Sequence, residues 1–310
     1  MEKPLVSIIV LNWNKRELLR KCLSSIRRNV EYPSYEVIVV DNNSSDGSVE
    51  MVKKCFSNVT IVENPKNYGY AKGNNEGVKV SKGIPFILNN DTTVERGAVT
   101  KMVRVLNSDK EIGVVGGALV TPDGRVQQHK FFFPTNSILS AIYSGLHERR
   151  ARKIFLKSVK SRVNKGGIEV DWVSGAALMI KRKVVNEVGM FYEPYFALYD
   201  EKDLCYRVKR AGYKVVWVPD AKIIHLHGAT APLDSKWRSD LIERNKLLFR
   251  IKEYPLVCAR VKAIFLYLVG IPRALILSFL CRDRRYLQAA QSKIKAFSYV
   301  KRGVEPPPRP

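Results

Sequence analysis

The feature that most constrains the fold is a regular alternation of two patterns over the first 120 residues. Short runs rich in β-branched residues, typical of buried strands, are separated by segments whose apolar residues recur at helical spacing. The strand-like runs lie at residues 5–11, 35–40, 59–63, 85–89 and 112–117, and the helical segments at 15–29, 47–56, 70–81 and 96–108. Such alternation predicts right-handed βαβ units, and therefore an α/β fold with a mostly parallel central sheet covered by helices on both faces.

Polar residues directly follow three of these runs. The three clusters are Asn12-Trp13-Asn14, Asp41-Asn42-Asn43 and Asn89-Asn90-Asp91. Because ligands of parallel α/β sheets gather outside the carboxyl ends of the strands, we expect the clusters to lie together and to mark a binding site. Asn and Asp are also common in turns and helix caps, so each cluster taken alone has a purely structural explanation.

Beyond residue 120 the pattern is less regular. Residues 125–168 are rich in Lys and Arg and are interpreted as loops and short helices that could form a lid. We then expect a strand at 176–180, a helix from about Asp200, strands near 214–217 and 222–226, and a helix over 236–252. The chain divides into an α/β half (1–120), a second half of the same domain (121–252), an apolar and basic helical segment (253–302) and a proline-rich tail expected to be disordered (303–310).

The charge of the chain is large and unevenly distributed. Of its 53 Lys and Arg and 29 Asp and Glu, residues 1–120 hold only 17 and 13, so most of the net charge of +24 belongs to residues 121–310. Such a surface could face nucleic acid, anionic lipid or a phosphorylated substrate, and charge alone does not choose among them. One alternative is therefore a non-catalytic protein that binds nucleic acid or another anionic surface, although it offers no account of the acidic strand ends.

Cysteines and apolar runs bear on the location of the protein. The five cysteines are scattered and odd in number, which favours reduced thiols in the cytoplasm, and the run at 5–11 is too short for a secretory signal. Residues 263–281 approach the length of a membrane span, but Pro272-Arg273 interrupts them, and an arginine at the bilayer centre costs at least about 2.5 kcal/mol. We expect apolar helices lying in the plane of an anionic membrane surface, at the inner face of the cell membrane. A buried or dimerising helix pair and a true span are the alternatives.

Three features of the first half could bind an activated substrate. Asp41 ends a strand, and its carboxylate could accept hydrogen bonds from a pyrimidine N3–H or a ribose hydroxyl, while Trp13 offers a flat face for a base. Three glycines spaced four apart within 69–77 share one helix face, which permits either close packing on the sheet or close approach of a diphosphate. Beside such a diphosphate, Asp91 would hold Mg²⁺, which takes one or two carboxylates plus substrate phosphates and waters.

Seven stretches, in this order, resemble the inverting family 2 glycosyltransferases of GT-A fold, particularly the rhamnosyltransferase-like branch that builds cell-surface glycans. They are VSIIVLNWN, VIVVDNNSSDGS, NYGYAKGNNEG, LNNDTTV, WVSGAALMIKR, FALYDEKDLCYRVKRAGYKVVWVP and IIHLHGAT. The resemblance runs from about residue 5 to about residue 252. It implies an enzyme that moves a sugar from a UDP- or dTDP-linked donor to a hydroxyl of a glycan or polyprenyl-linked acceptor.

The resemblance also implies roles for individual residues. Asp41 would contact the nucleoside of the donor and Trp13 its base, with Asn12, Asn74 and Asn90 as further donor-binding residues.

Asn89-Asn90-Asp91 resembles the family's DxD element, in which Asp91 keeps the metal-binding acid and Asn89 stands in place of the first acid. His225 resembles a late histidine that can complete the metal site, and His227 is a reserve candidate. The implied cofactor is a divalent metal ion, Mg²⁺ or Mn²⁺.

The stretch YDEKDL (199–204) resembles the family's acidic ED-x-D motif. Its second acid, Glu201, would be the general base, with Asp200 as the alternate, and a single base implies direct displacement with inversion. Acids at a helix start also complement the helix dipole, which is the structural explanation. A sugar nucleotidyltransferase is the second alternative class. Such an enzyme usually needs a glycine-rich triphosphate loop near the N-terminus, which VLNWNKR (10–16) does not resemble.

Overall fold

The computed structural model describes residues 3–127, 163–164, 166–226 and 236–253, together with parts of 271–296. The stretch expected to form loops and a lid (125–168) therefore lies largely outside the described residues. The same holds for His227, most of the apolar segment 263–281 and the proline-rich tail.

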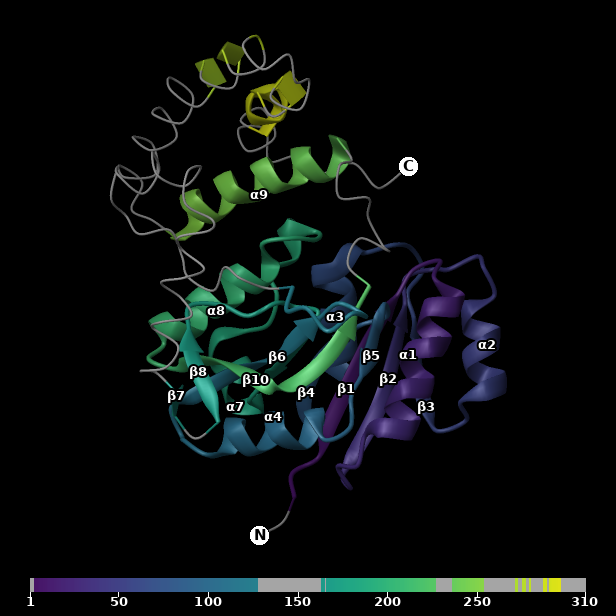
Figure 1. Cartoon of the computed structure of the whole chain (residues 1–310). Coiled ribbons are helices and arrows are strands. Elements are labelled where there is room, and N and C mark those ends of the chain that lie inside the picture. Colours follow the sequence, from purple (N-terminus) through teal and green to yellow (C-terminus); the bar gives the residue numbers. More distant parts are fainter. Residues whose placement is uncertain are drawn as a thin grey trace.

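One ten-stranded sheet forms the centre of the molecule (Figure 1). Its strands are β1 (Val6–Asn12), β2 (Tyr35–Asp41), β3 (Val59–Glu63), β4 (Ile84–Asn89), β5 (Thr92–Val94), β6 (Ile112–Val120), β7 (Val163–Asn164), β8 (Gly167–Val170), β9 (Ala177–Ile180) and β10 (Lys214–His225). The order across the sheet is β3-β2-β1-β4-β9-β6-β10-β8-β7, and the short β5 pairs with β10 beside this path.

Most strands of the sheet run in one direction. β3, β2, β1 and β4 pair in parallel, and so do β6 and β10. β9 lies antiparallel between β4 and β6, so it joins two groups of strands that share a direction. The α/β fold class with a mostly parallel sheet, predicted from the sequence, is thus confirmed.

Helices cover both faces of this sheet. They are α1 (Arg16–Asn29), α2 (Ser48–Cys55), α3 (Gly69–Val80), α4 (Ala98–Asn107), α7 (Arg182–Val188) and α8 (Asp200–Arg210). The chain also forms α9 (Lys236–Glu253) and a 3₁₀ turn, η1 (Glu193–Tyr195). α1, α2 and α4 pack into a core that includes Ile8 and Val10 of β1, whereas α3, α7 and α8 pack into a second core that includes Ile9. Successive residues of β1 therefore point to opposite faces, as both-sided burial of a strand requires.

The second half of the chain differs in detail from the expectation. The two strands expected near 214–217 and 222–226 are one strand, β10, whose pairing with β6 shifts register between Val218 and Lys222. β5, β8 and α7 were not expected, because all three are short. The two strands also depend on pairing with β10, which is distant from them in the sequence. Among the described residues, no helix combines the length and apolar character needed to cross a membrane.

Candidate active site

The carboxyl ends of β1, β2 and β4 bring three of the predicted donor-binding residues into one buried network. β1 pairs with β2 so that Asn12 lies opposite Asp41, and with β4 so that Leu11 lies opposite Asn89. Asn12 Nδ2 donates to Asp41 Oδ1 at 3.2 Å, and Asn90 Nδ2 donates to Asn12 Oδ1 at 2.8 Å. The three residues of the network are at most 5% exposed. Strand register alone therefore gathers these polar groups.

The loops that follow β1 and β2 are tied to each other. Ser44 N donates to Asp41 Oδ2 at 2.7 Å, and Asn14 N donates to Ser44 Oγ at 2.9 Å. Asn14 has a φ of 50°, in the left-handed region that asparagine tolerates better than most residues. Trp13 is half-buried and lies in the same loop, directly after Asn12. Each oxygen of Asp41 keeps a second lone pair with which it could accept a ligand donor.

Asn74, the remaining donor-binding candidate, lies on α3. Its side chain is fully buried, and its Nδ2 donates to the Tyr70 carbonyl at 2.9 Å, so this hydrogen bond stays within the helix. The structure therefore does not join Asn74 to the network of the strand ends. Its Oδ1 is buried without a hydrogen-bond partner, which leaves an acceptor that a ligand could satisfy.

The glycines of α3 are explained by packing. A Cβ on Gly73 would lie 2.5 Å from Leu11 Cδ1, and a Cβ on Gly77 would lie 2.5 Å from Ile9 Cγ2. Both distances are shorter than carbon atoms tolerate, so glycine permits α3 to lie close against β1. Of the two explanations open from the sequence, close helix–sheet packing is the one that these contacts support.

Asp91 and His225 meet at one side of this edge. β5 follows Asp91 directly and pairs antiparallel with β10, which places Thr92 opposite His225. His225 Nε2 lies 3.3 Å from Asp91 Oδ1. Asp91 is 4% exposed and His225 is 6% exposed. The pairing is long-range, so it brings together two residues that are 134 positions apart in the sequence.

Gln127 fixes the orientation of the His225 ring. Its amide Nε2 donates to the His225 carbonyl at 2.5 Å, so its Oε1 faces His225 Nδ1, 2.8 Å away. Nδ1 must therefore carry the proton of that hydrogen bond, and in the neutral ring Nε2 is the basic nitrogen. Metal-binding histidines commonly use their second nitrogen in this way. Sequence analysis missed Gln127, which follows no recognisable motif.

These residues fit a divalent cation. Asp91 Oδ1 is a buried carboxylate oxygen without a hydrogen-bond partner, and an imidazole nitrogen faces it. The part of the chain that the structure describes contains no cluster of three or more His, Cys, Asp or Glu suited to a metal. Two protein ligands are nevertheless enough for an ion that is also bound by substrate phosphates. Asn89 is half-buried at the end of β4, and its carbonyl accepts the Thr92 hydroxyl at 2.6 Å.

The predicted base and its alternate begin α8. Asp200 is the first residue of the helix and is 1% exposed, whereas the next residue, Glu201, is half-buried. Burial raises the pKa of Asp200 well above its usual value, and the charge and hydrogen bonding of Glu201 raise it further. Both effects favour the protonated form of Asp200. Its Oδ2 is buried without a hydrogen-bond partner.

The third acid of α8, Asp203, is a structural residue. It is fully buried, and its two oxygens bind Arg207 Nε at 2.8 Å and Lys252 Nζ at 2.7 Å. The Tyr195 hydroxyl donates to it at 3.2 Å. Because two cations neutralise this carboxylate, it joins α8 to α9 and is not available to take a proton from a substrate.

Tyr70 lies near two groups of acidic residues, Asp91 after β4 and the pair Asp200 and Glu201 at the start of α8. Its hydroxyl donates to the Gly175 carbonyl at 2.7 Å. Burial raises the pKa of the phenol well above its usual value, and the carboxylates of Asp200, Glu201 and Asp91 raise it further. The start of α8 and the end of β4 thus face the same region around one tyrosine. Sequence analysis missed Tyr70, although it lies within the NYGYAKG stretch.

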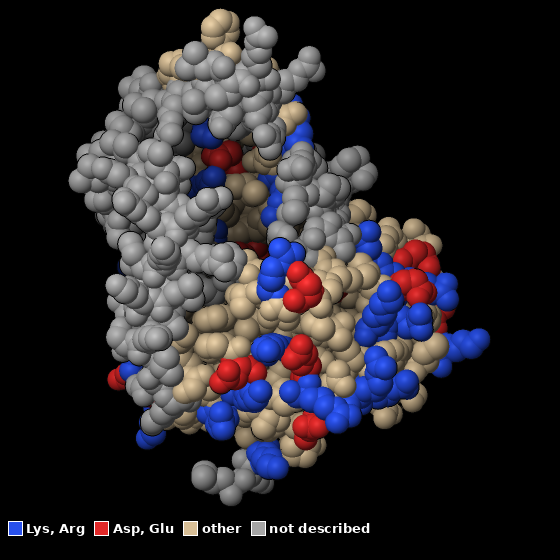
Figure 2. Space-filling model, in the orientation of Figure 1, with Lys and Arg blue, Asp and Glu red and all other residues tan. Residues whose placement is uncertain are grey.

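The first turn of α9 also approaches Glu201. Burial lowers the pKa of the Arg238 guanidinium, and the charge of Glu201 opposes this shift, so the two side chains lie near each other. Figure 1 shows α9 lying beyond the end of the sheet opposite the N-terminus. Figure 2 shows both basic and acidic side chains spread over the visible face of the α/β body.

This fold, with acids and amides gathered where its parallel strands end, defines an α/β enzyme of the GT-A type. The family model described as "Glycosyl transferase family 2" matches residues 7–189, more than half of the chain. The chain therefore belongs to glycosyl transferase family 2 and is a glycosyltransferase. This assignment replaces both other classes considered from the sequence, an anionic-surface binder and a sugar nucleotidyltransferase.

Curated relatives agree with the family. An N-acetylglucosaminyl-diphospho-decaprenol L-rhamnosyltransferase of Mycobacterium tuberculosis is 24% identical over 235 residues, which are 70% of this chain and 75% of that protein. Rhamnosyltransferase WbbL of Escherichia coli is 24% identical over 71% of this chain and 83% of its own length. An uncharacterized Sinorhizobium fredii protein is 28% identical over 73% of this chain, which spans only 25% of that longer protein.

Solved structures share the fold. A mannosyltransferase of Pyrobaculum calidifontis, in complex with GDP-Man and Mn²⁺, has a TM-score of 0.60 at 18% identity and covers 96% of this chain and 87% of its own. GalNAc-T7 with UDP, GalNAc and Mn²⁺ has a TM-score of 0.63 at 13% identity, and the likeness covers 99% of this chain and 59% of that one. At these identities the likeness establishes the GT-A architecture.

Proposed function

We propose that the protein transfers a sugar, with inversion, from a UDP- or dTDP-linked donor to a hydroxyl of a lipid-linked glycan. The observation that carries this proposal is that Asp91 and Glu201, from distant parts of the sequence, both lie within electrostatic reach of the buried Tyr70 hydroxyl. A donor diphosphate bound near Asp91 would then present its sugar to an acceptor activated near Glu201. The names of the rhamnosyltransferase relatives, one of which acts on a diphospho-decaprenol acceptor, favour this substrate class.

Glu201 is the general base of the proposal. Burial raises the pKa of Asp200, which favours its protonated form, and Glu201 is the more exposed of the two acids, so Glu201 is the better placed to meet an acceptor. An acceptor hydroxyl is a weak nucleophile, and removal of its proton as the new bond forms typically contributes about 10²–10⁴-fold to the rate. The acceptor oxygen forms its bond to the anomeric carbon as the bond to the nucleoside diphosphate breaks on the opposite face, so direct displacement inverts that carbon.

Asp91 and His225 would hold the divalent metal, with Asn89 close by. When bound, Mg²⁺ or Mn²⁺ would stabilise the charge that develops on the departing diphosphate. The unpartnered Asp91 Oδ1 and the orientation of the His225 ring support this role. Mn²⁺ in the complexes of both structural neighbours is consistent with it.

The buried network of Asn12, Asp41 and Asn90 would bind the nucleoside, with Trp13 against the base. Asp41 is held by Asn12 and by the amide of Ser44, so its carboxylate is oriented before a ligand arrives. A carboxylate that is already oriented suits the N3–H of uracil or thymine, because it does not have to reorient when the base binds.

The apolar and basic segment 253–302, of which the structure describes parts of 271–296, would attach the enzyme to an anionic membrane surface at the inner face of the cell membrane. Several apolar side chains among the described residues of this stretch are exposed, and Phe279 reaches 85%. Large apolar side chains that are exposed to water together indicate a surface that binds a membrane or another partner. Attachment at the interface would place the site beside a polyprenyl-linked acceptor.

A thermal-shift screen tests the proposed function. The panel comprises UDP-glucose, UDP-galactose, UDP-N-acetylglucosamine, dTDP-glucose and dTDP-L-rhamnose, each with Mg²⁺, with Mn²⁺ or with EDTA. We expect at least one sugar nucleotide to raise the unfolding temperature, and the rise to be larger with metal than with EDTA. If no member of the panel stabilised the protein under any condition, the proposal would be wrong.

A further inference from the structure

The turn that leads into α8 has an unfavourable backbone. Phe196, Leu198 and Tyr199 have φ angles of 64°, 67° and 75°. Left-handed conformations are rare for side chains of this size, and three within four residues require the surroundings to impose them. Asp200 and Glu201 follow this turn directly, so its conformation decides where the two carboxyl groups point.

One buried side chain of α9 binds most of the carbonyls of this turn. Asn245 is fully buried, and its Nδ2 donates to Leu198 O at 2.7 Å, Ala197 O at 2.8 Å and Tyr195 O at 3.1 Å. An amide NH₂ has two protons, so one of them is shared between two carbonyls. Arg244 Nη1 donates to Asn245 Oδ1 at 2.9 Å, which fixes the orientation of the amide.

The carbonyls that Asn245 does not reach have partners elsewhere. Pro194 O accepts Arg244 Nη1 at 2.8 Å, and Phe196 O accepts the amides of Tyr70 and Ala71 at the start of α3, at 2.5 Å and 3.1 Å. Every carbonyl from 194 to 198 is therefore held by a group outside the turn. α9 holds one side of the turn and α3 the other.

We propose that Asn245 is a positioning residue for the reaction: it holds the 195–199 turn in its left-handed conformation and thereby aims Glu201 at the acceptor. The inference rests on the proposed role of Glu201 as the base. Asn245 itself is buried, and its hydrogen bonds go to the carbonyls of the turn and to the Arg244 side chain, so its proposed role is to position Glu201 and not to contact the reacting atoms. Its removal should leave donor binding at the strand ends intact and should impair the transfer step.

Amide hydrogen exchange of the full chain tests the structural part without any ligand. In Asn245→Ala we expect peptides covering 195–204 to lose protection, while peptides covering β1 and β2 exchange as in the wild type. Protection of 195–204 at the wild-type level would overturn the inference. If Asn245→Ala fails to fold, the same measurement is made on the double variant Asn245→Ala/Leu198→Gly. Glycine at position 198 tolerates the left-handed conformation without the hydrogen bonds of Asn245. Failure of that double variant to fold would equally overturn the inference.

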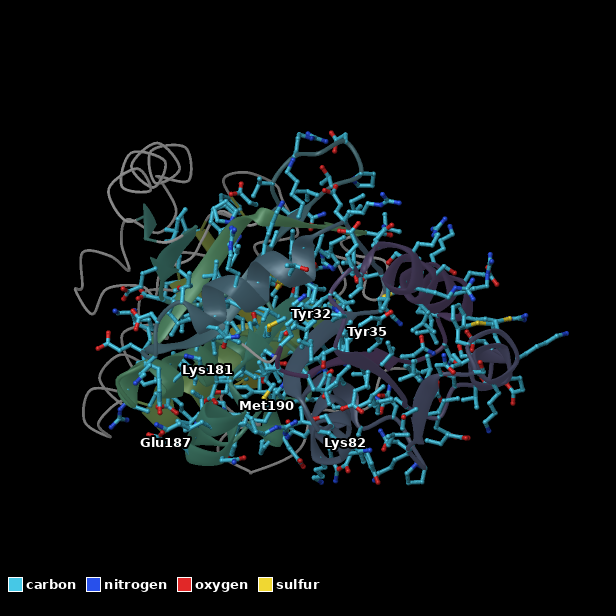
Figure 3. All side chains as sticks on the ribbon, turned by 90° about the horizontal axis from the view of Figure 1, so that it is seen from below. Tyr32, Tyr35, Lys82, Lys181, Glu187 and Met190 are labelled. Atoms are coloured by element: carbon cyan, nitrogen blue, oxygen red, sulfur yellow. The ribbon has the colours of Figure 1, made fainter. Side chains whose placement is uncertain are left out.

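Arg182→Met is the matched control. Arg182 also binds three carbonyls, those of Val78, Ser81 and Gly83, at 3.3, 2.9 and 2.7 Å. These contacts lie at the amino end of β4, away from the site. Figure 3 views this end, with the neighbouring residues Lys181 and Lys82 labelled. We expect this variant to lose comparable stability while 195–204 stays protected and turnover is unchanged.

Kinetics test the functional part, with the sugar nucleotide of the panel that gives the largest thermal shift. Release of the nucleoside diphosphate should be about 100-fold slower in Asn245→Ala, because small misplacements of a reacting group cost rates of this order, whereas the KM for the donor should change little. Leu198→Gly should recover much of the rate in the Asn245→Ala background. An unchanged rate in Asn245→Ala, or no rescue, would overturn the inference.

The two proposals fail in distinguishable ways. If Glu201→Gln loses turnover and Asn245→Ala does not, Glu201 remains the base and the positioning role is wrong. If Glu201→Gln keeps turnover, the base assignment is wrong, whatever Asn245→Ala does. If no donor binds, the proposed function fails, and the exchange experiment still decides whether Asn245 holds the turn.

Discussion

Among the residues that the structure describes, three buried side-chain oxygens have no hydrogen-bond partner, and all three belong to residues that the sequence assigned to the site. They are Asn74 Oδ1, Asp91 Oδ1 and Asp200 Oδ2. A buried acceptor without a donor lowers stability, so folded proteins keep few of them and tend to keep them where a ligand or a proton will arrive. At the scale of single residues, this is the strongest independent support for the proposed site.

Glu201→Gln should abolish transfer while donor binding persists. The substitution keeps the size of the side chain and removes the carboxylate that accepts a proton, so we expect the rate to fall by about 10²–10⁴-fold. Turnover of a stabilising donor and its thermal shift are measured on the same preparation. Near-normal turnover would show that another group is the base.

Asp91→Asn should weaken metal-dependent donor binding. An amide oxygen is neutral and binds Mg²⁺ or Mn²⁺ less strongly than a carboxylate, so the extra thermal shift that metal gives to a donor should shrink or vanish. The free protein should not be destabilised, because Asp91 Oδ1 has no hydrogen-bond donor to lose. Titration calorimetry of Mn²⁺ with the donor present checks the prediction, and unchanged metal affinity would contradict it.

Asp200→Asn should change how stability depends on pH. The folded state raises the pKa of Asp200 by burial and by the charge of Glu201, so it keeps a proton that the unfolded chain releases above the ordinary value of 3.8. Wild-type stability should therefore fall as pH rises from that value, and the asparagine variant should lack this loss. Urea unfolding from about pH 4 to about pH 8 measures the difference, with the exposed Asp220→Asn as control. A constant difference between Asp200→Asn and wild type would contradict the raised pKa.

At the scale of elements, local pattern predicted the first half of the sheet and its helices, but not the pairings that complete the site. The helical segment expected at 15–29 is α1, and each β-branched run became a strand. β5 is three residues long and exists through its pairing with β10, so no local signal announces the meeting of Asp91 and His225. The candidate role of His225 came from the family resemblance alone.

The contacts that orient site residues are also long-range. Gln127 reaches His225, and Asn245 reaches a turn about 47–50 positions earlier. Neither residue type is distinctive, and neither lies in a motif. Physical reasoning from one sequence can therefore propose the groups that do chemistry at strand ends, whereas the groups that hold them in place require the structure.

Gly77→Ala should destabilise the fold by separating α3 from the sheet. The added Cβ would lie 2.5 Å from Ile9 Cγ2 and 2.8 Å from Val40 Cγ2, both in the core. Overpacking of this kind costs about 1–3 kcal/mol, against a gain of roughly 1 kcal/mol in helix propensity. We expect a net loss in urea unfolding. The exposed Lys79→Ala on the same helix should stay within about 0.5 kcal/mol, and a stabilised Gly77→Ala would contradict the packing explanation.

At the scale of the whole molecule, the two halves of the chain share one sheet, and both contribute to the proposed site. β9, from the second half, lies between β4 and β6 of the first, and α9 and α3 hold opposite sides of the turn before Glu201. Neither half can therefore form the site alone. The second half also carries most of the positive charge, on the same part of the chain as the exposed apolar side chains of 271–296. Both properties favour an anionic membrane surface.

Phe279→Glu in the full chain should weaken binding to anionic vesicles by tenfold or more. The wild-type side chain is 85% exposed, so its burial in the interface is available to membrane binding and not to folding. Loss of a buried aromatic ring removes roughly 2 kcal/mol, and the new negative charge adds repulsion of about 1 kcal/mol near an anionic surface. Flotation with phosphatidylglycerol vesicles measures the effect, with phosphatidylcholine vesicles to isolate the contribution of charge. Val80→Glu is the matched control, because Val80 is 46% exposed at the end of α3, outside the segment. Equal flotation of Phe279→Glu and wild type would show that this segment does not contact the membrane.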